Sequence, residues 1–261
     1  MDLDLTDKIA VVTGASRGIG LAITRALVRE GAQVVAGARS ASDELTALAA
    51  SGRVHHVAVD LSTSSDAARL VEAAAQRGGA DILINNVGAV TPRLGGFLGV
   101  SDKDWLTSLT LNLMAAVRTT RAALPAMIAA GRGVIVTTSS VNAILPDPTV
   151  IDYSAAKAAL SNFCKSLSKE LGPHGIRVNT VSPGPVATDL WLGNDGVAAI
   201  IARSSGGHPE EIEAGAAAES ITGRFTRPDE VADLVLFLAS DRAANITGAD
   251  FTIDGGLITT L

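Results

Sequence analysis

The sequence of 261 residues has few of the residues that build disulfides and metal sites. Its single cysteine, Cys164, cannot form an internal disulfide, and it shares an apolar helical stretch with Leu160 and Leu167. We therefore expect a buried structural thiol at this position. The four histidines are scattered without ligand-like spacing, at positions 55, 56, 174 and 208. The sequence thus predicts no metal centre.

Positive charge and long apolar runs are also scarce. The 21 lysines and arginines face 27 acidic residues, which gives a formal net charge of -6. This balance argues against nucleic acid or an anionic membrane as the main partner. No uncharged apolar run reaches the ~20 residues of a membrane helix. The acidic start MDLDLTDK has no hydrophobic targeting core, so we expect a soluble, cytoplasmic protein.

What the sequence does contain is a regular alternation of short β-rich runs with longer helical patterns. Hydrophobic residues make up 47% of the chain, and its length suits one large core. Strands this apolar, alternating with helices, indicate a parallel sheet covered on both faces. Right-handed crossovers then lead to one doubly wound, Rossmann-type α/β domain over residues 1–261, with about seven strands.

The expected strands begin at positions 9, 33, 54, 81, 133, 176 and 250, and the expected helices cover 19–30, 66–76, 102–130, 154–171 and 229–240, with a weaker pattern over 42–50. Residues 189–222 do not fit this alternation, because they are rich in glycine and carry Trp191, Leu192, Ile200 and Ile201. Long structured excursions of this kind often cover active sites. We expect a partly helical, substrate-binding lid; the alternative is a surface insertion that packs only locally.

The segment TGASRGIG, residues 13–20, directly follows the first expected strand and opens the first helix. Its glycines permit a tight turn, close approach of a pyrophosphate and close packing of helix on sheet. The helix N-terminus then offers free N–H groups and a partial positive charge to the phosphates. A glycine pattern alone is weak, but this context predicts a dinucleotide site.

The end of the second expected strand indicates which nicotinamide cofactor is bound. An acid about 20 residues after the glycine loop usually holds the ribose 2′-hydroxyl of NAD. Here residues 37–40 read GARS, and the first acid is Asp43. Arg39 can bind a 2′-phosphate through two hydrogen bonds, and Arg17 offers a second cation. Although both could be ordinary surface arginines, we expect NADP(H) rather than NAD(H).

The run YSAAK places Tyr153 and Lys157 four residues apart, on one face of a helix. A free tyrosine ionises near pH ~10, and a neighbouring ammonium favours the phenolate, so we expect a lowered pKa for Tyr153. Ser140 offers a hydroxyl to hold a reacting oxygen. Tyrosine and lysine at this spacing also occur by chance on solvated helices, so the meaning of the pair depends on the other motifs.

Taken together, these motifs resemble those of the short-chain dehydrogenase/reductase family, in its single-domain branch, over almost the whole chain. TGASRGIG is similar to the family's cofactor loop. NNVG, residues 85–88, is similar to the family's NNAG, with Val87 in place of alanine. Asn112 in LTLNLMA matches the family's helix asparagine, and Ser140, Tyr153 and Lys157 match the rest of its catalytic tetrad. Motif order and length also resemble the 3-oxoacyl-(acyl-carrier-protein) reductases.

The resemblance implies cofactor contacts in the glycine loop and after several strands: Gly14, Ser16, Arg17, Gly18, Ile19, Gly20, Arg39, Asp60, Leu61, Asn86, Gly88, Pro183, Gly184, Val186 and Thr188, together with Tyr153 and Lys157. It also implies that Asn112 holds a water linking Lys157 to solvent. From the residues alone, a structural asparagine would be favoured. Ser139 competes with Ser140, since adjacent strand residues face opposite sides. The thirteen-residue spacing to Tyr153 selects Ser140.

The resemblance implies an NADP(H)-dependent oxidoreductase that interconverts a ketone and a secondary alcohol, with Tyr153 as general acid and base. The apolar residues of the lid suggest a medium-to-large apolar ketone. A 3-oxoacyl-(ACP or CoA) reductase is the alternative, although the acidic chain offers an acidic carrier only Arg132 in the turn over 127–133. A non-catalytic NADP-binding regulator is more remote, since such proteins commonly lose the tyrosine or lysine. Helices 102–130 and 154–171 are apolar on several faces, which suggests a homo-oligomer, a dimer or a tetramer.

Overall fold

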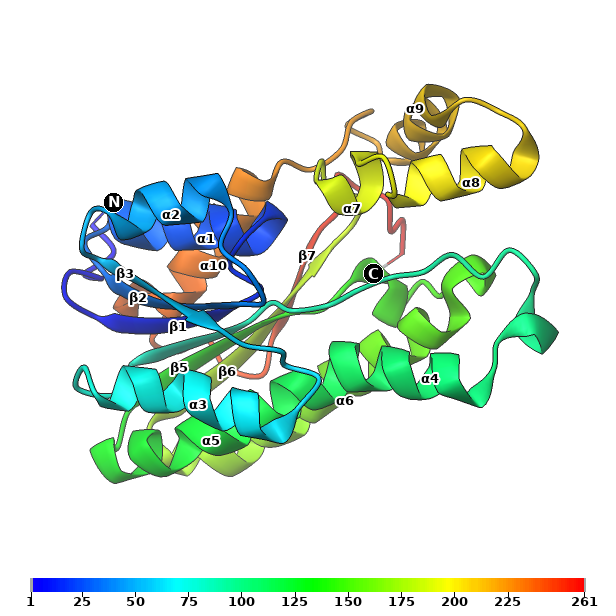
Figure 1. Cartoon of the computed structure of the whole chain (residues 1–261). Helices are drawn as coiled ribbons and strands as arrows, with labels where there is room; N and C mark the ends of the chain where they lie inside the picture. The colour runs from blue at the N-terminus through cyan, green and yellow to red at the C-terminus, as the bar shows by residue number, and fades with distance from the viewer. Residues whose placement is uncertain (1, 261) are drawn as a thin grey trace.

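Seven parallel strands form the central layer of the protein, in the order β3-β2-β1-β4-β5-β6-β7 (Figure 1). The computed structural model describes residues 2–260. Almost every residue of β1, β2, β4, β5 and β6 is buried, because helices cover both faces of the sheet. The strands are β1 (Ile9–Thr13), β2 (Gln33–Ala38), β3 (Val54–Ala58), β4 (Ile82–Asn85), β5 (Gly133–Thr138), β6 (Ile176–Pro183) and β7 (Asp250–Ile253). This topology confirms the predicted doubly wound α/β fold.

The helices form two outer layers (Figure 1). One face carries α1 (Gly18–Arg29), α2 (Asp43–Ala49) and α10 (Pro228–Ala239). The other carries α3 (Ser64–Ala75), α4 (Asp102–Leu109), α5 (Ala115–Ala130) and α6 (Ile151–Leu171). Short 3₁₀ turns complete the connections: η1 (Phe97–Gly99), η3 (Val141–Ala143), η4 (Pro148–Val150), η5 (Gly172–His174) and η6 (Asp241–Ala243). A separate apolar cluster lies on each side of the sheet, and Cys164 is buried in the second.

The single helix predicted over 102–130 is wrong in one respect, because a π-helical turn, η2 (Thr110–Met114), separates α4 from α5. A π turn contains one residue more than an α-helical turn. Apolar periodicity did not reveal it, because this helix is apolar on several faces. Asn112 lies in the turn and is buried, so the irregularity falls on a predicted site residue.

The other predicted helices occur with shifted ends, which capping side chains explain. α3 begins at Ser64, where the hydroxyl of Thr63 accepts a hydrogen bond from the N–H of Asp66. The weak pattern over 42–50 is a real helix, α2, and Ser42 caps it in the same way. α6 begins three residues before its predicted start, at Ile151.

Residues 189–222 contain three short helices, α7 (Asp189–Leu192), α8 (Val197–Ser205) and α9 (Pro209–Glu219). They lie beyond the end of the sheet rather than against either face (Figure 1). This agrees with a partly helical excursion, while its role as a lid stays a prediction. Across residues 2–260, no helix combines the length and apolar character needed to cross a membrane.

Candidate active site

The crevice of the sheet lies where the strand order reverses, between β1 and β4. The connections from these two strands leave toward opposite faces, which opens a gap at the carboxyl ends. A hollow of about 250 Å³ occupies this place. The glycine loop and the segments that follow β2, β3 and β4 line it.

The glycine loop presents its backbone to the hollow through Gly14, Ser16, Gly18 and Ile19. α1 begins at Gly18, and no side chain caps its first N–H groups. These groups are therefore available to an anion. Gly20 does not line the hollow but packs closely on the loop, since a Cβ there would lie 2.2 Å from the carbonyl oxygen of Gly14; its contact with a cofactor stays a prediction.

Two exposed arginines, Arg17 and Arg39, line the outer part of the hollow. Among residues 2–260, neither arginine belongs to an ion pair. Asp60 and Leu61 line the same part. Hydrogen bonds from Ser62, and then the charge of Arg39, lower the pKa of Asp60. This end of the hollow thus combines two cations with a carboxylate.

The segment after β4 forms the inner wall. The amide of Asn86 donates to the carbonyl oxygen of Thr13 at 3.1 Å, and its own oxygen accepts from Thr138 Oγ1 at 3.4 Å, so Asn86 ties β1 to β5. A Cβ on Gly88 would lie 2.9 Å from Asn112 Oδ1 and 3.4 Å from Lys157 Nζ. Only glycine leaves room there. Val87, where the resembled family has alanine, lines the hollow and packs on the second core cluster.

Ser140, Tyr153 and Lys157 meet beside this wall. The phenol of Tyr153 is within hydrogen-bonding reach of the Ser140 hydroxyl. Lys157 Nζ lies 5.6 Å from the centre of the Tyr153 ring and donates to the carbonyl oxygen of Thr138 at 2.9 Å. The Ser139 hydroxyl instead bonds to Ser161 Oγ at 2.7 Å, on the face of α6. The structure therefore brings Ser140, and not Ser139, to the tyrosine.

The expected effect of Lys157 on Tyr153 is wrong in this structure. Loss of water around the partly buried phenol raises the pKa of Tyr153, and the Ser140 hydrogen bond opposes this more weakly. Burial lowers the pKa of Lys157 to about 8. Spacing along a helix predicted the proximity of the two groups, whereas desolvation determines the direction of both shifts. Tyr153 therefore keeps its proton at neutral pH.

Asn112 holds the segment after β4 in place. Its Oδ1 accepts from the N–H of Ala89 at 3.0 Å, and its Nδ2 donates to the carbonyl oxygen of Ala89 at 2.8 Å. The π turn brings this amide to the loop, where it also donates to the carbonyl oxygen of Ser108 at 3.1 Å. This is the structural role that the residues alone favoured. Its role in holding a water stays a prediction.

Some predicted cofactor contacts do not line the hollow. Gly184 donates its N–H to the carbonyl oxygen of Ile253 at 3.0 Å, and Val186 is buried and bridges Thr226. Pro183 ends β6 and pairs with Ile253 of β7, as Gly184 does, so these two residues support the C-terminal strand, whereas Thr188 does line the hollow. Sequence reasoning missed further lining residues: Gly37, Ala38, Val59, Val87, Ala89, Leu111, Asp189 and Leu190. Most of them adjoin a predicted residue, and Leu111 adjoins Asn112, but Leu190 does not and reaches the hollow from α7.

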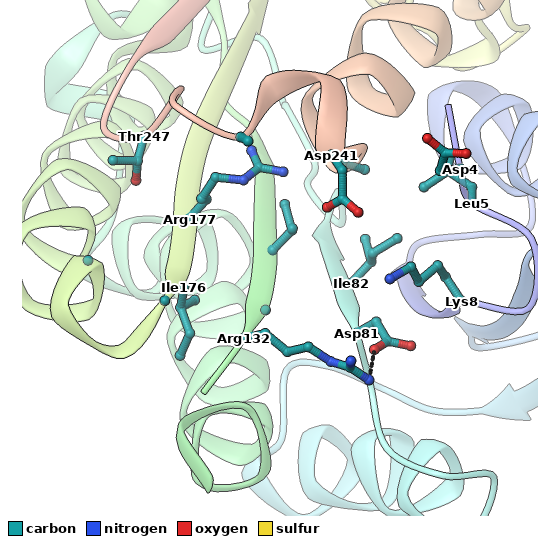
Figure 2. Close-up of a pocket in the computed structure, with 16 residues that line it drawn as sticks. Asp4, Leu5, Lys8, Asp81, Ile82, Arg132, Ile176, Arg177, Asp241 and Thr247 are labelled. Atoms are coloured by element: carbon teal, nitrogen blue, oxygen red, sulfur yellow. Dashed lines mark ion pairs between the residues drawn. The ribbon is translucent and has the colours of Figure 1, made fainter. Parts of the chain in front are cut away.

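A second hollow, of about 320 Å³, lies at the opposite edge of the sheet (Figure 2). Charged side chains line it, and several of them are used within the protein. Asp81 and Arg132 form an ion pair at 3.4 Å, and Arg177 donates to the carbonyl oxygens of Leu238 and Ser240 at 2.8 and 2.9 Å. Across residues 2–260, no group of three or more His, Cys, Asp or Glu side chains is arranged to bind a metal ion. The carboxyl-edge hollow is therefore the candidate active site.

Comparison with known proteins gives consistent matches. The family model described as enoyl-(acyl carrier protein) reductase matches residues 14–258. The 3-oxoacyl-(acyl-carrier-protein) reductase FabG of Thermotoga maritima is 33% identical over 259 residues, covering 97% of this chain and 99% of the relative. The L-rhamnose 1-dehydrogenase (NAD(P)(+)) of Azotobacter vinelandii is 35% identical over 274 residues, covering 98% of this chain and 99% of the relative.

Among solved structures, the L-sorbose reductase of Gluconobacter frateurii, complexed with NADPH and L-sorbose, superposes with a TM-score of 0.91. It is 37% identical, and the match covers 100% of both chains. The reactions named for these similar proteins concern different substrates, a carrier-bound acyl group in one case and sugars in the others. The shared fold therefore leaves the substrate of this chain open.

Proposed function

Since the chain belongs to the short-chain dehydrogenase/reductase family, we propose that this oxidoreductase interconverts a ketone and a secondary alcohol with NADP(H). One observation carries the proposal. Ser140, Tyr153 and Lys157 meet next to Gly88, which lines the hollow, and Arg17 and Arg39, neither of them ion-paired within residues 2–260, line the same hollow. A proton donor beside a hollow that carries two cations suits a phosphorylated dinucleotide.

The residues present fit such a cofactor. The uncapped start of α1 would hold the pyrophosphate, and Arg17 and Arg39 would hold the 2′-phosphate. Asp60 and Leu61 would lie on the adenine side, and Gly88 leaves the room that a larger residue would fill. NADPH, when bound, supplies the hydride that the carbonyl carbon accepts.

The chain's own groups manage the proton. Tyr153, whose raised pKa keeps it protonated at neutral pH, donates its hydroxyl proton to the carbonyl oxygen as the carbon accepts hydride. The Ser140 hydroxyl donates a hydrogen bond to the same oxygen and stabilises its developing negative charge. Lys157, charged below about pH 8, stabilises the tyrosinate that remains. In the direction of oxidation the proton moves back to Tyr153.

The segments around the cleft support a medium-to-large apolar ketone as substrate. Exposed apolar side chains recur in three segments, each of which follows the carboxyl end of a strand. Water-exposed leucine, isoleucine and phenylalanine on neighbouring loops are typical of a surface that binds an apolar ligand. They are Leu94 and Phe97 after β4, Ile144 and Leu145 after β5, and Leu190 and Leu192 after β6.

The alternative substrate is a 3-oxoacyl thioester, as the name of the Thermotoga relative suggests. An acidic carrier protein would need cations near the cleft. Arg132, the only cation in the turn singled out by the sequence, lies at the opposite edge of the sheet and pairs with Asp81. Within one chain, this position of Arg132 disfavours an acyl substrate that is bound to a carrier protein. Because Tyr153 and Lys157 are both present and adjacent, a non-catalytic NADP-binding regulator is disfavoured as well.

A direct test is to titrate the purified protein with NADPH and NADH, and then to follow NADPH absorbance with a panel of ketones and alcohols. We expect tighter binding of NADPH and turnover that favours apolar ketones over sugars. Equal affinity for both cofactors would contradict the role of Arg17 and Arg39. Preference for sugars would contradict the apolar substrate.

We also propose a homo-oligomer, either a dimer or a tetramer. Leu106 on α4 is 65% exposed and Ile128 on α5 is 40% exposed, on helices whose composition suggested burial on more than one side. Light scattering after gel filtration gives the mass directly. A monomer at micromolar concentration would contradict the proposal, and Leu106→Glu should shift an oligomer toward smaller species. The expected cytoplasmic location stays a prediction.

A further inference from the structure

Arg93 connects three segments that border the active site, although no motif in the sequence singled it out. It lies between β4 and α4, five residues after Gly88. Its Nε lies 3.2 Å from each carboxylate oxygen of Asp152, and its Nη2 lies 2.5 Å from Oδ2. Its Nη1 donates to Asp104 Oδ1 at 3.0 Å. One guanidinium thus joins its own loop to the first turns of α6 and α4.

The Arg93–Asp152 pair is the most buried ion pair between residues 2–260. The side chain of Asp152 is 3% exposed and that of Arg93 is 15% exposed. A planar guanidinium with two contacts to one carboxylate accepts little variation in geometry. Removing Arg93 would leave the Asp152 carboxylate buried without this partner. The pair therefore holds its two segments in one arrangement.

The first turn of α6 depends on this contact because it has no capping side chain of its own. Val150 is its N-cap residue and cannot accept a hydrogen bond through its side chain. Arg93 fixes the entry of the helix from outside, since its own N–H donates to the carbonyl oxygen of Thr149 at 2.6 Å. Asp104 is in turn held by a capping box with Ser101.

Asp152 immediately precedes Tyr153 in that turn. We propose that Arg93 is a positioning residue: through Asp152 it sets where the first turn of α6 places the Tyr153 phenol relative to Ser140. The inference rests on the proposed function, in which Tyr153 carries the proton. Arg93 does not line the hollow in the described part of the chain. Cofactor binding should therefore not depend on it.

The main test is Arg93→Lys, which keeps the charge but loses the two-pronged contact. We expect kcat to fall about tenfold to a hundredfold, as for a catalytic group displaced by a fraction of an ångström to one ångström. The Kd for NADPH should stay unchanged. The solvent isotope effect on kcat should rise, because a misplaced phenol makes proton transfer slower. A role in stability alone would lower kcat only in proportion to the folded fraction.

A second measurement needs no turnover. Tyr153 is the only tyrosine of the chain, so the ultraviolet absorption of tyrosinate titrates this one phenol. We expect Arg93→Lys to move the titration midpoint toward that of free tyrosine, because a looser first turn admits water to the ring. An unchanged midpoint together with an unchanged solvent isotope effect would overturn the proposal.

Two controls separate positioning from stability. Arg177→Lys alters another arginine with several hydrogen bonds, at the opposite edge of the sheet, and should lower Tm without changing the tyrosine titration. Arg93→Met combined with Asp152→Leu removes both charges and should recover Tm but not kcat. Recovery of both would contradict the proposal. If the double variant does not fold, the tyrosine titration of Arg93→Lys decides.

The same experiments separate a failure of the positioning role of Arg93 from a failure of the proposed oxidoreductase function. A wild-type protein that reduces no carbonyl compound would contradict the proposed function, while the tyrosine titration would still report whether the Arg93–Asp152 pair positions Tyr153. Active wild-type protein with Arg93→Lys equal to it in kcat and in titration would contradict only the role of Arg93.

Discussion

The two edges of the sheet carry hollows of comparable size but different chemistry. At the amino edge, Asp81 pairs with Arg132 and Arg177 bonds to the end of α10, so these three side chains serve the fold. At the carboxyl edge, the start of α1 has no cap, and Arg17 and Arg39 form no ion pairs within residues 2–260. The larger hollow is therefore not the better candidate site. What distinguishes the carboxyl edge is a helix start without a capping side chain, with two arginines beside it that form no ion pair within residues 2–260.

This difference arises from topology. In a parallel sheet, every carboxyl end of a strand points to the same edge, and the loops there are free to carry function. The amino edge receives the ends of the helices instead, and their last carbonyl oxygens need donors. Arg177 supplies such donors to α10, which is why a half-buried arginine lies at that edge.

The largest effect is expected from Tyr153→Phe, a change at the carboxyl edge of the sheet. Loss of the proton donor should lower kcat about a hundredfold to ten-thousandfold, the usual contribution of a general acid. The Kd for NADPH and Tm should change little, because the ring and its packing remain. Steady-state kinetics and calorimetric titration measure both quantities. Turnover equal to that of the wild type would remove Tyr153 from the reaction.

Lys157 should make stability depend on pH. Its pKa is about 8 in the folded chain and near 10.5 when unfolded, so the folded state binds fewer protons between these values. The unfavourable burial of the ammonium is fully present below about pH 8, and stability should rise as pH increases toward about 10.5, by about 3 kcal/mol. Denaturation of wild type and Lys157→Met across this range isolates the effect. If the free energy of unfolding changed with pH equally in the two proteins, Lys157 would not be the source of the pH dependence.

At the amino edge, Arg177→Met should affect stability and not catalysis. The loss leaves the carbonyl oxygens of Leu238 and Ser240 without this donor, which costs about 2–3 kcal/mol. Urea denaturation measures the loss. Since the site lies at the other edge, kcat and KM of the folded variant should equal those of the wild type. A fall in kcat would mean that the two edges are coupled.

At the carboxyl edge, Arg39→Asp should weaken NADPH binding about tenfold to a hundredfold, the effect of losing charge-assisted hydrogen bonds to a phosphate. NADH binding should change little, so preference shifts toward NADH. Arg29→Asp is the matched control, because it alters net charge equally at the exposed far end of α1. Equal effects of the two variants would show a general charge effect and no phosphate site.

The smallest effect is expected for Arg132→Ala. Arg132 is 72% exposed in its pair with Asp81, and exposed pairs contribute only about 0.5 kcal/mol. Tm and all kinetic constants should be close to those of the wild type. A marked loss of activity toward carrier-bound acyl substrates alone would revive the carrier alternative.

Much of the site could be predicted because its motifs are local. The glycine loop binds through backbone groups that lie next to each other in sequence, and Lys157 lies near Tyr153 because both share one helix face. Gly184, a predicted residue that does not line the hollow, lies in a segment whose path depends on β7, distant in sequence. Leu111 was missed because it reaches the hollow from a helix.

The sequence by itself determined the alternation of strands and helices, the family, and the spacing of Ser140, Tyr153 and Lys157, since these follow from periods of a few residues. Only the tertiary structure decided that the glycine loop, Arg39 and Leu190 line one hollow, that a π turn carries Asn112, and that Arg93 meets Asp152, 59 residues away. It also reversed the expected pKa shift of Tyr153. The reason is common to all four: burial and long-range contacts depend on how distant segments pack, which no local pattern encodes.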